Sequence, residues 1–232
     1  YMKVVFDFDG VLFDTAYEAY VVAKVAYQKT VNSDFYCDYE DFLRYRHKVT
    51  TAWNYKYVLD CISTNDKEKS SYRKLIQNSK EKDYSVFEKV FFIERSKMKE
   101  KNFSKWLSLN KPYPIIQKII NIKLNYQDVF IVSTKDKQTI IDIIKKYEGL
   151  DILENNIYGH DDYNEYKNKS AIIKEKILTK ERLVFIDDID KHFEGFGSDT
   201  PQVETILADW GYVPPGAQGS MNVKDVIELL RN

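Results

Sequence analysis

The sequence predicts an α/β protein whose parallel sheet is interrupted, after its first strand, by an α-helical insertion. Residues Val4–Phe6 are β-branched or aromatic, as is typical of a short buried strand. After residue 110, apolar strand-like runs alternate with helical runs, and this alternation favours right-handed crossovers and a parallel sheet covered on both faces. The sequence between these two parts has a helical pattern. We therefore expect a core domain of residues 1–14 and 110–232 and a helical domain of residues 15–109.

The first strand ends at two carboxylates, Asp7 and Asp9, directly before Gly10. Two acids at i and i+2 of an extended backbone project to one side, where they could share a metal ion and a substrate. Because the two carboxylates repel each other, a cation must neutralise them, and Mg²⁺ is the hard, oxygen-seeking candidate. Asp-Gly between alternating apolar residues is also the usual signal of a β-hairpin, so both interpretations stay open at this point.

The inserted stretch reads as a series of helices. Apolar and aromatic residues recur every three or four positions in Ala16–Thr30, which indicates one face of an amphipathic helix. The helical pattern continues from Tyr39 to Asn102, with breaks near 49–51 and 63–66. A basic cluster, Arg44–Lys48, could meet an anionic group of a ligand, although a solvated helix face is the more common meaning of such a cluster.

The alternating elements of the C-terminal part begin at Asn110–Pro114, since proline pre-sets the first turn of a helix and disfavours helix in the residue before it. A helix is expected from there through about Leu124. The strands expected after it are Val129–Val132, Ile157–Tyr158, Leu183–Ile186 and Val203–Leu207, and the helices are Lys135–Tyr147, Ser170–Leu178 and Val223–Leu230.

Polar residues directly follow two of these strands. Ser133 comes after Val129–Val132, with Thr134 as the neighbouring candidate, and either hydroxyl could instead cap the next helix. Asp187 and Asp188 close the strand that begins at Leu183, and adjacent carboxylates there are costly unless a cation is near. Because ligands of open parallel sheets bind at the carboxyl ends of the strands, we expect these groups to gather at one edge.

The stretch Asp7-Phe-Asp9-Gly-Val11, followed in order by Ser133, a lysine and Asp187-Asp188, resembles the motifs of the haloacid dehalogenase superfamily, most of whose members are phosphatases. The resemblance implies a Rossmann-like three-layer core with an α-helical cap domain inserted just after the first motif, as in phosphoglycolate phosphatase-like relatives. The resemblance covers the core segments, residues 2–15 and 110–232. The Trp210-Gly-Tyr212 stretch is also similar to one near the active-site rim of those relatives, although Trp210 could equally be a core residue.

The resemblance also implies roles for individual residues. Asp7 would attack phosphorus and form an aspartyl-phosphate, and Asp9 would protonate the leaving group and later activate water. Ser133 and a lysine would bind the transferring phosphoryl group. Of the two lysines in the third motif, Lys169 is preferred to Lys167 because it stands just before an apolar helical face, although the proline that usually follows this lysine is absent.

The same resemblance implies an Mg²⁺ ion held by Asp7, by the backbone carbonyl of Asp9 and by Asp188, with Asp187 assisting. Many relatives carry a further Asp where this chain has His192, and Asp190 is a possible substitute for it. The presence of an acid at Asp9 points to phosphoryl chemistry, since hydrolytic dehalogenases of the superfamily lack one there.

The expected function is therefore Mg²⁺-dependent hydrolysis of a small phosphate monoester, a small phosphorylated metabolite. Three alternatives stay open: a sugar-phosphate mutase of the β-phosphoglucomutase kind, a phosphonate hydrolase with a buried cap lysine that forms a Schiff base, and a binding or regulatory module that has kept the fold and lost turnover. Neither the substrate nor the oligomeric state can be read from the sequence.

The bulk properties agree with this expectation. The 35 basic and 36 acidic residues nearly balance, which argues against a nucleic-acid or membrane-surface role driven by charge. No apolar run approaches the roughly 18 residues that a membrane span needs, and no secretory signal is visible, so a cytoplasmic location is expected. The two cysteines, Cys37 and Cys61, lack the spacing of a zinc site and are expected to be buried thiols.

Overall fold

The computed structural model describes residues 2–64, 69–213, 217 and 219–231. The chain divides into two compact units. One consists of Tyr1–Asp14 and Lys111–Asn232, and the other of Thr15–Asn110. We call the first the core unit and the second the helical unit.

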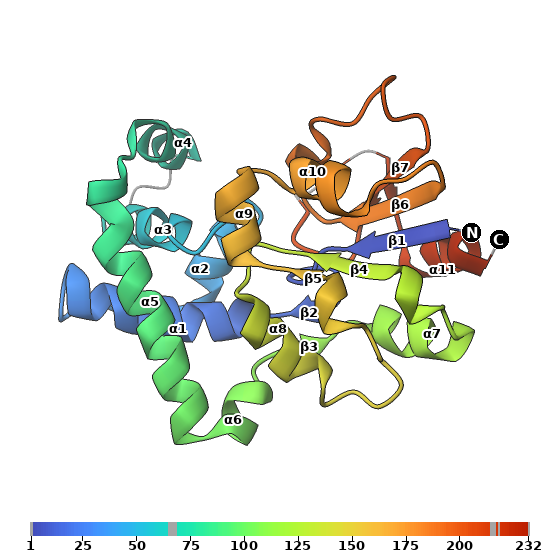
Figure 1. The fold of residues 1–232 in the computed structure, drawn as a ribbon. Helices are drawn as coiled ribbons and strands as arrows, with labels where there is room; N and C mark the ends of the chain where they lie inside the picture. Colours follow the sequence, from blue (N-terminus) through green and yellow to red (C-terminus); the bar gives the residue numbers. More distant parts are fainter. Residues whose placement is uncertain (1, 65–68, 214–216, 218, 232) are drawn as a thin grey trace. The chain divides into compact units, whose positions relative to one another are not determined.

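The core unit is built on a six-stranded parallel sheet (Figure 1). Its strand order is β5-β4-β1-β6-β7-β8, so the N-terminal strand lies in the middle, between two strands that come much later in the sequence. This arrangement confirms the predicted α/β class with a parallel sheet. The strands are β1 (Met2–Phe6), β4 (Val129–Val132), β5 (Ile157–Tyr158), β6 (Arg182–Asp187), β7 (Val203–Ala208) and β8 (Ser220–Met221).

Both faces of the sheet are buried, as the continuous apolar runs of its central strands require. On one face, Val5 and Phe185 pack in a cluster with Ile172 and Ile173. The neighbouring strand residues, which point to the opposite face, are buried as well: Val4, Phe6, Val184 and Ile186 are each at most 2% exposed. The helices of the core unit are α7 (Pro114–Ile122), α8 (Lys137–Ile144), α9 (His160–Tyr166), α10 (Lys169–Ile172) and α11 (Val223–Arg231).

Helices α8 and α10 differ most from the prediction in their bounds. Helix α8 begins two residues later than expected, because the Asp136 side chain accepts a hydrogen bond from the backbone N–H of Thr139 (2.8 Å) and caps the helix there. Helix α10 ends at Ile172 and continues as a π-helical turn over Ile173–Ile177. Short 3₁₀ turns lie at Tyr126–Asp128, Glu154–Asn156 and Asp190–Phe193.

The Asp-Gly sequence after β1 does not form a β-hairpin. β1 pairs in parallel with β4 and β6, and the chain beyond it makes a tight turn in which the N–H of Gly10 donates to the carbonyl of Phe13 (2.8 Å). The next strand, β2 (Phe13–Asp14), pairs instead with β3 (Lys111–Pro112), and the two are antiparallel. The chain thus leaves the core unit along β2 and returns to it along β3.

The helical unit has an aromatic-rich core. A cluster of buried residues that includes Tyr20, Phe42, Tyr55 and Phe91 joins its helices. They are α1 (Ala16–Thr30), α2 (Tyr39–Arg46), α3 (Asn54–Ser63), α4 (Lys69–Asn78), α5 (Glu81–Lys101) and α6 (Phe103–Leu107). The gap between α2 and α3 includes the break predicted near 49–51, whereas the break predicted near 63–66 lies partly outside the described residues.

A fully buried ion pair lies inside this unit. Glu18 on α1 accepts two hydrogen bonds from Arg95 on α5, at 2.8 and 2.9 Å, and a third from the indole N–H of Trp106 at 3.1 Å. The Arg95 guanidinium also lies 4.6 Å from the centre of the Phe91 ring. These bonds satisfy a carboxylate that is 0% exposed, as a buried charge requires.

Cys37 and Cys61 are free and buried, which confirms the expectation for both. The basic cluster of α2 does not form one solvated face. Arg44 is exposed and pairs with Asp41, but Arg46 is buried and donates to the carbonyl of Val49 (3.2 Å). Among the described residues, we find no helix with both the length and the apolar character needed to cross a membrane.

Candidate active site

The predicted catalytic groups follow three adjacent strands of the core sheet. In the parallel register, Phe6 at the end of β1 is paired with Ile131 of β4 and with Ile186 of β6. The residues that come next therefore leave the sheet at the same edge. The N–H of Asp7 donates to the carbonyl of Ile186 (2.9 Å), which continues the β1–β6 pairing one residue further. Asp7, Ser133 and the Asp187–Asp188 pair thus lie along one edge of the sheet.

Lys169 joins two of these strand ends. Its Nζ lies 2.8 Å from Asp7 Oδ1 and 2.8 Å from Asp187 Oδ2, and the side chain is 1% exposed. The lysine starts α10, whose N-terminus is capped by Asn168 through a bond from the N–H of Ala171 (2.7 Å). Lys167, the alternative from the sequence, is exposed and has the left-handed φ of 68° at the end of α9. The geometry therefore selects Lys169 as the lysine beside Asp7.

His192 extends this cluster. Its Nδ1 lies 2.9 and 3.0 Å from the two carboxylate oxygens of Asp187, and the residue is buried. Ligand-type atoms of Asp7, Asp187 and His192 all lie within 4.8 Å of one another. Because the Lys169 ammonium already bonds two of these three side chains, the cluster is an ionic network in which one positive charge partly offsets two carboxylates. Asp190, the other residue considered as an outer metal ligand, is exposed.

The network shifts the pKa values of the two acids that share Lys169 in opposite directions. Burial raises the pKa of Asp7 to about 6, although Lys169 opposes this shift. Burial acts in the same direction on Asp187, but His192 and Lys169 more than offset it and hold the pKa of Asp187 at about 2. Burial alone would lower the pKa of Lys169, and the two carboxylates together raise it above its usual value. The site therefore favours the charged forms of Asp187 and Lys169, and it favours protonation of Asp7 relative to a free aspartate.

Asp188 lies against the turn that carries Asp7 and Asp9. It is 1% exposed, and its Oδ2 accepts a hydrogen bond from the backbone N–H of Tyr212 (2.6 Å). A side chain at Gly10 would overlap the Asp188 carboxylate, and Gly10 also has a φ of +88° that residues with a Cβ rarely adopt. Glycine is needed here because the carboxylate occupies the space that a Cβ would take.

The Trp210–Tyr212 segment braces the same turn. The Trp210 indole N–H donates to the carbonyl of Val11 (2.9 Å), and the Tyr212 hydroxyl donates to Asp14 Oδ1 (2.8 Å). Tyr212 thus bonds the carboxylate of Asp188 through its backbone and the end of β2 through its side chain. Trp210 is half-buried and hydrogen-bonded, so it is not a purely apolar core residue.

We expect Tyr212→Phe to lower the free energy of unfolding by about 0.5–1.5 kcal/mol, because it removes one hydroxyl hydrogen bond and keeps both the ring and the backbone N–H. Urea denaturation of both proteins measures this difference. A variant as stable as the parent would show that the bond to Asp14 adds nothing in solution.

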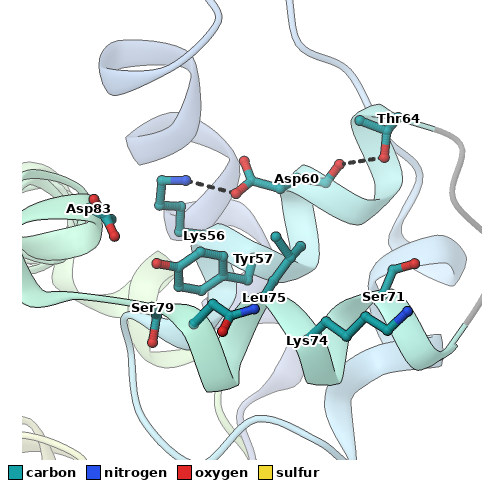
Figure 2. A pocket seen from close by; sticks show the side chains of 10 residues that line it. Lys56, Tyr57, Asp60, Thr64, Ser71, Lys74, Leu75, Ser79 and Asp83 are labelled. Carbon is teal, nitrogen blue, oxygen red and sulfur yellow. Dashed lines mark hydrogen bonds and ion pairs between the residues drawn. The ribbon is translucent and has the colours of Figure 1, made fainter.

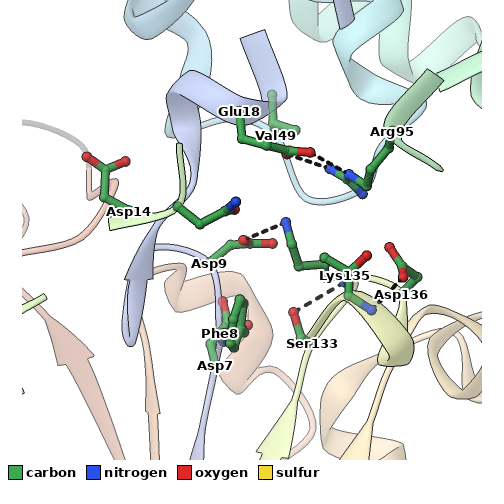
Figure 3. A network of polar contacts seen from close by, with 12 residues as sticks. Asp7, Phe8, Asp9, Asp14, Glu18, Val49, Arg95, Ser133, Lys135 and Asp136 are labelled. Carbon is green, nitrogen blue, oxygen red and sulfur yellow. Dashed lines mark hydrogen bonds and ion pairs between the residues drawn. The ribbon is translucent and has the colours of Figure 1, made fainter. Parts of the chain in front are cut away.

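A second lysine lies at this edge, and the sequence interpretation did not assign it a role. Lys135 Nζ is 3.0 Å from Asp9 Oδ1, with side-chain exposures of 3% and 17% (Figure 3). Its backbone N–H donates to Ser133 Oγ (3.2 Å). Ser133 is buried at the end of β4 and does not cap α8, since Asp136 does. A lysine two residues after a strand-end serine is the available signal, but in a lysine-rich sequence the same position is equally typical of the start of a helix.

A separate cavity of about 780 Å³ lies within the helical unit (Figure 2). It is bounded by α3, α4 and the start of α5, and two of its charged lining residues on α3, Lys56 and Asp60, pair with each other at 2.7 Å. None of the predicted catalytic or metal-binding residues lines it. The side chains around it include Tyr57, Leu75, Asn78, Ser79 and Asp83.

Comparison with known proteins identifies the fold family. No protein-family model and no curated protein matches the sequence. Solved structures match over almost its whole length. A predicted phosphatase from Clostridium acetobutylicum is 15% identical, with a TM-score of 0.64 over 99% of this chain and 98% of that one. A haloacid dehalogenase-like family hydrolase from Streptococcus pneumoniae is 14% identical, with a TM-score of 0.58 over 98% of each chain. The protein has the haloacid dehalogenase fold.

A third structure with this fold is a predicted phosphoglycolate phosphatase from Haemophilus somnus. It is 12% identical, with a TM-score of 0.62 over 98% of this chain and 96% of that one. The likeness covers the helical insertion as well as the sheet. Within the haloacid dehalogenase fold, the chain keeps an acid pair after β1, a hydroxyl after β4, a buried lysine at the start of α10 and an acid pair after β6. These are the groups that the sequence motifs predicted at this edge.

Proposed function

We propose that the protein is an Mg²⁺-dependent phosphatase that hydrolyses a small phosphate monoester, a small phosphorylated metabolite, through an aspartyl-phosphate on Asp7. The observation that carries this proposal is the Asp7 carboxylate at the end of the central strand, 2.8 Å from the buried ammonium of Lys169. A nucleophile, a fixed cation and a second acid, Asp9, two residues away are the parts that phosphoryl transfer needs. The phosphatases and hydrolases among the solved structures of the same fold support the assignment.

The donor set suits Mg²⁺. Asp7 and Asp188 would supply carboxylate oxygens and Asp9 its backbone carbonyl, which are the hard oxygen ligands that this ion prefers. The absence of a Cβ at Gly10 leaves space for the Asp188 carboxylate beside the turn that carries the other two residues. The ion would offset negative charge on the phosphoryl oxygens.

In the first step, an Asp7 carboxylate oxygen attacks phosphorus while the bond from phosphorus to the leaving oxygen breaks. The electron pair of that bond goes to the leaving oxygen, which takes a proton from the Asp9 carboxyl group. Lys169 and the Ser133 hydroxyl stabilise charge on the phosphoryl oxygens. Lys169 can do this without moving, since Asp187 holds its ammonium in place at 2.8 Å.

In the second step, water attacks the same phosphorus atom. Asp9, now a carboxylate, takes a proton from the water as its oxygen bonds to phosphorus, and the bond to Asp7 breaks. Inorganic phosphate leaves, and Asp7 and Asp9 return to their starting states. Each carboxyl group thus has one task in each half of the reaction.

The raised pKa of Asp7, about 6, predicts that Mg²⁺ affinity depends on pH. Below that value Asp7 is mostly protonated and Mg²⁺ must displace a proton, so the apparent affinity should rise roughly tenfold per pH unit up to about 6 and then level off. Asp187 contributes nothing to this change, because its pKa of about 2 keeps it ionised throughout. Isothermal titration calorimetry with MgCl₂ at several pH values measures the effect, and a constant affinity between about pH 5 and 7 would contradict it.

The rival activities have different signatures. A mutase would return the phosphoryl group to a product, so it would show a transient bisphosphate and no net phosphate release. A phosphonate hydrolase needs a buried cap lysine, whereas the buried lysines of the described residues, Lys135 and Lys169, both belong to the core unit. A binding module would release no phosphate at all.

The test is phosphate release from 4-nitrophenyl phosphate with and without Mg²⁺, followed by a panel of phosphorylated metabolites. We expect turnover that requires the metal and is lost with a chelator. No phosphate release from any substrate at saturating Mg²⁺ would contradict the proposed function.

A further inference from the structure

We infer that Lys135 is a positioning residue that orients the Asp9 carboxyl group toward the leaving oxygen of the substrate. This inference rests on the proposed function, because it assigns Asp9 the proton transfer described above. Its starting point is the Lys135–Asp9 pair, in which Nζ lies 3.0 Å from Oδ1 (Figure 3).

The Lys135 side chain begins from a fixed backbone. Its own N–H donates to Ser133 Oγ (3.2 Å), and its carbonyl accepts a bond from the N–H of His160 (2.9 Å). A Cβ at Gly159 would overlap the backbone of Lys135 and Lys137, so the chain passes very close to this segment. With both peptide groups held and the side chain 3% exposed, the ammonium has little freedom to leave Asp9.

The two buried ammonium groups at this edge are divided between the acids. Lys169 bonds Asp7 and Asp187, and Lys135 bonds Asp9. A buried ammonium is costly to desolvate, and its attraction to one carboxylate offsets that cost only in part, so a buried ion pair is weak evidence of a gain in stability. What the pair does fix is the position of the Asp9 carboxyl group, 3.0 Å from the Lys135 ammonium.

An aspartate side chain at a strand end has several staggered orientations, and a proton donor must take one of them. A charge-assisted hydrogen bond favours the orientation that makes it by roughly ten- to hundredfold. Because the ammonium donates to Oδ1, a proton carried by Asp9 belongs on Oδ2. Lys135 thus selects both the rotamer and the oxygen that gives the proton to the leaving group.

The test compares two substrates that need this proton to different extents. The leaving group of an alkyl phosphate is a strongly basic alkoxide, so its departure depends on the acid. The leaving group of 4-nitrophenyl phosphate is a stable phenolate, which hardly needs a proton. We expect Lys135→Met to lower kcat/KM for an alkyl phosphate by about 100-fold and for 4-nitrophenyl phosphate by about threefold or less. kcat/KM is the suitable constant because it reports the steps up to formation of the aspartyl-phosphate.

Asp9→Asn should show the same selectivity between the two substrates. Once Asp9 has lost its acid function, Lys135 has nothing to orient, so the double variant should be no slower than Asp9→Asn alone. Lys137→Met, which changes an exposed lysine two residues away, is the matched control and should leave both substrates unaffected. Lys135→Leu, which also removes the donor, repeats the test should the methionine variant fail to fold, as judged by its circular dichroism and unfolding midpoint.

Three results would overturn the inference while the proposed function stands. The first is an equal loss of kcat/KM on both substrates, and the second is a double variant in which the losses of Lys135→Met and Asp9→Asn multiply. The third is a gain of kcat/KM on the alkyl phosphate, which would mean that Lys135 holds Asp9 away from the substrate. No turnover of either substrate by the parent protein would instead overturn the proposed function.

Discussion

Asp7→Asn is expected to abolish phosphate release, lowering kcat/KM for 4-nitrophenyl phosphate by at least about 10³-fold, because an amide cannot attack phosphorus in place of the carboxylate. The substitution is nearly isosteric, and Lys169 keeps its bond to Asp187 (2.8 Å). Loss of activity should therefore come without loss of the fold. A continuous assay of nitrophenolate release with Mg²⁺ present measures the change.

The matched control is Asp209→Asn, which removes an exposed carboxylate just after β7 in the same unit. Its activity should equal that of the parent. If Asp7→Asn keeps more than about a tenth of the parent activity, Asp7 is not the nucleophile and the mechanism proposed for this site is wrong.

Lys169→Met is expected to have the largest effect on stability, lowering the free energy of unfolding by about 3–5 kcal/mol near neutral pH. The methionine fills a similar volume but leaves Asp7 and Asp187, which are 4% and 0% exposed, without the ammonium that pairs with both of them. Two carboxylates at this distance repel, so the pKa of Asp7 should rise further. Activity should fall as well, since the cation beside the nucleophile is gone.

Lys167→Met is the natural comparison, because Lys167 is the other lysine of the same motif and its side chain is exposed. We expect it to change the free energy of unfolding by less than about 0.5 kcal/mol. Urea denaturation monitored by circular dichroism gives both values. Equal stability of the two variants would mean that the buried network around Lys169 does not exist in solution.

The core sheet could be predicted from the sequence because its strands are short apolar runs that end in polar residues. Val129–Val132 is predicted to the residue, and the strand predicted as Leu183–Ile186 lies inside β6. Helix bounds were less accurate because local capping decides them. Asp136 competes with Ser133 and Thr134 for the start of α8, and the bond from Thr139 to Asp136 shows which of them caps the helix.

The candidate site was only partly predictable, for a physical reason. Strand-end residues such as Asp7, Ser133 and Asp188 are placed by the parallel register, which follows from the order of the elements. The partners of Asp9 and Asp187 depend on side chains that reach across from other segments. Lys135 comes after β4 and His192 from the turn after β6, and neither contact leaves a periodic or spacing signal in the sequence.

The central claim is that the phosphoryl group is carried by Asp7 between the two steps. Rapid mixing with a phosphate monoester and Mg²⁺, followed by borohydride reduction and peptide mass spectrometry, tests it directly, since borohydride converts an aspartyl-phosphate to homoserine. We predict homoserine at position 7, formed only when both substrate and Mg²⁺ are present. Phosphate release without any modification of Asp7, or modification at a different residue, would contradict the account.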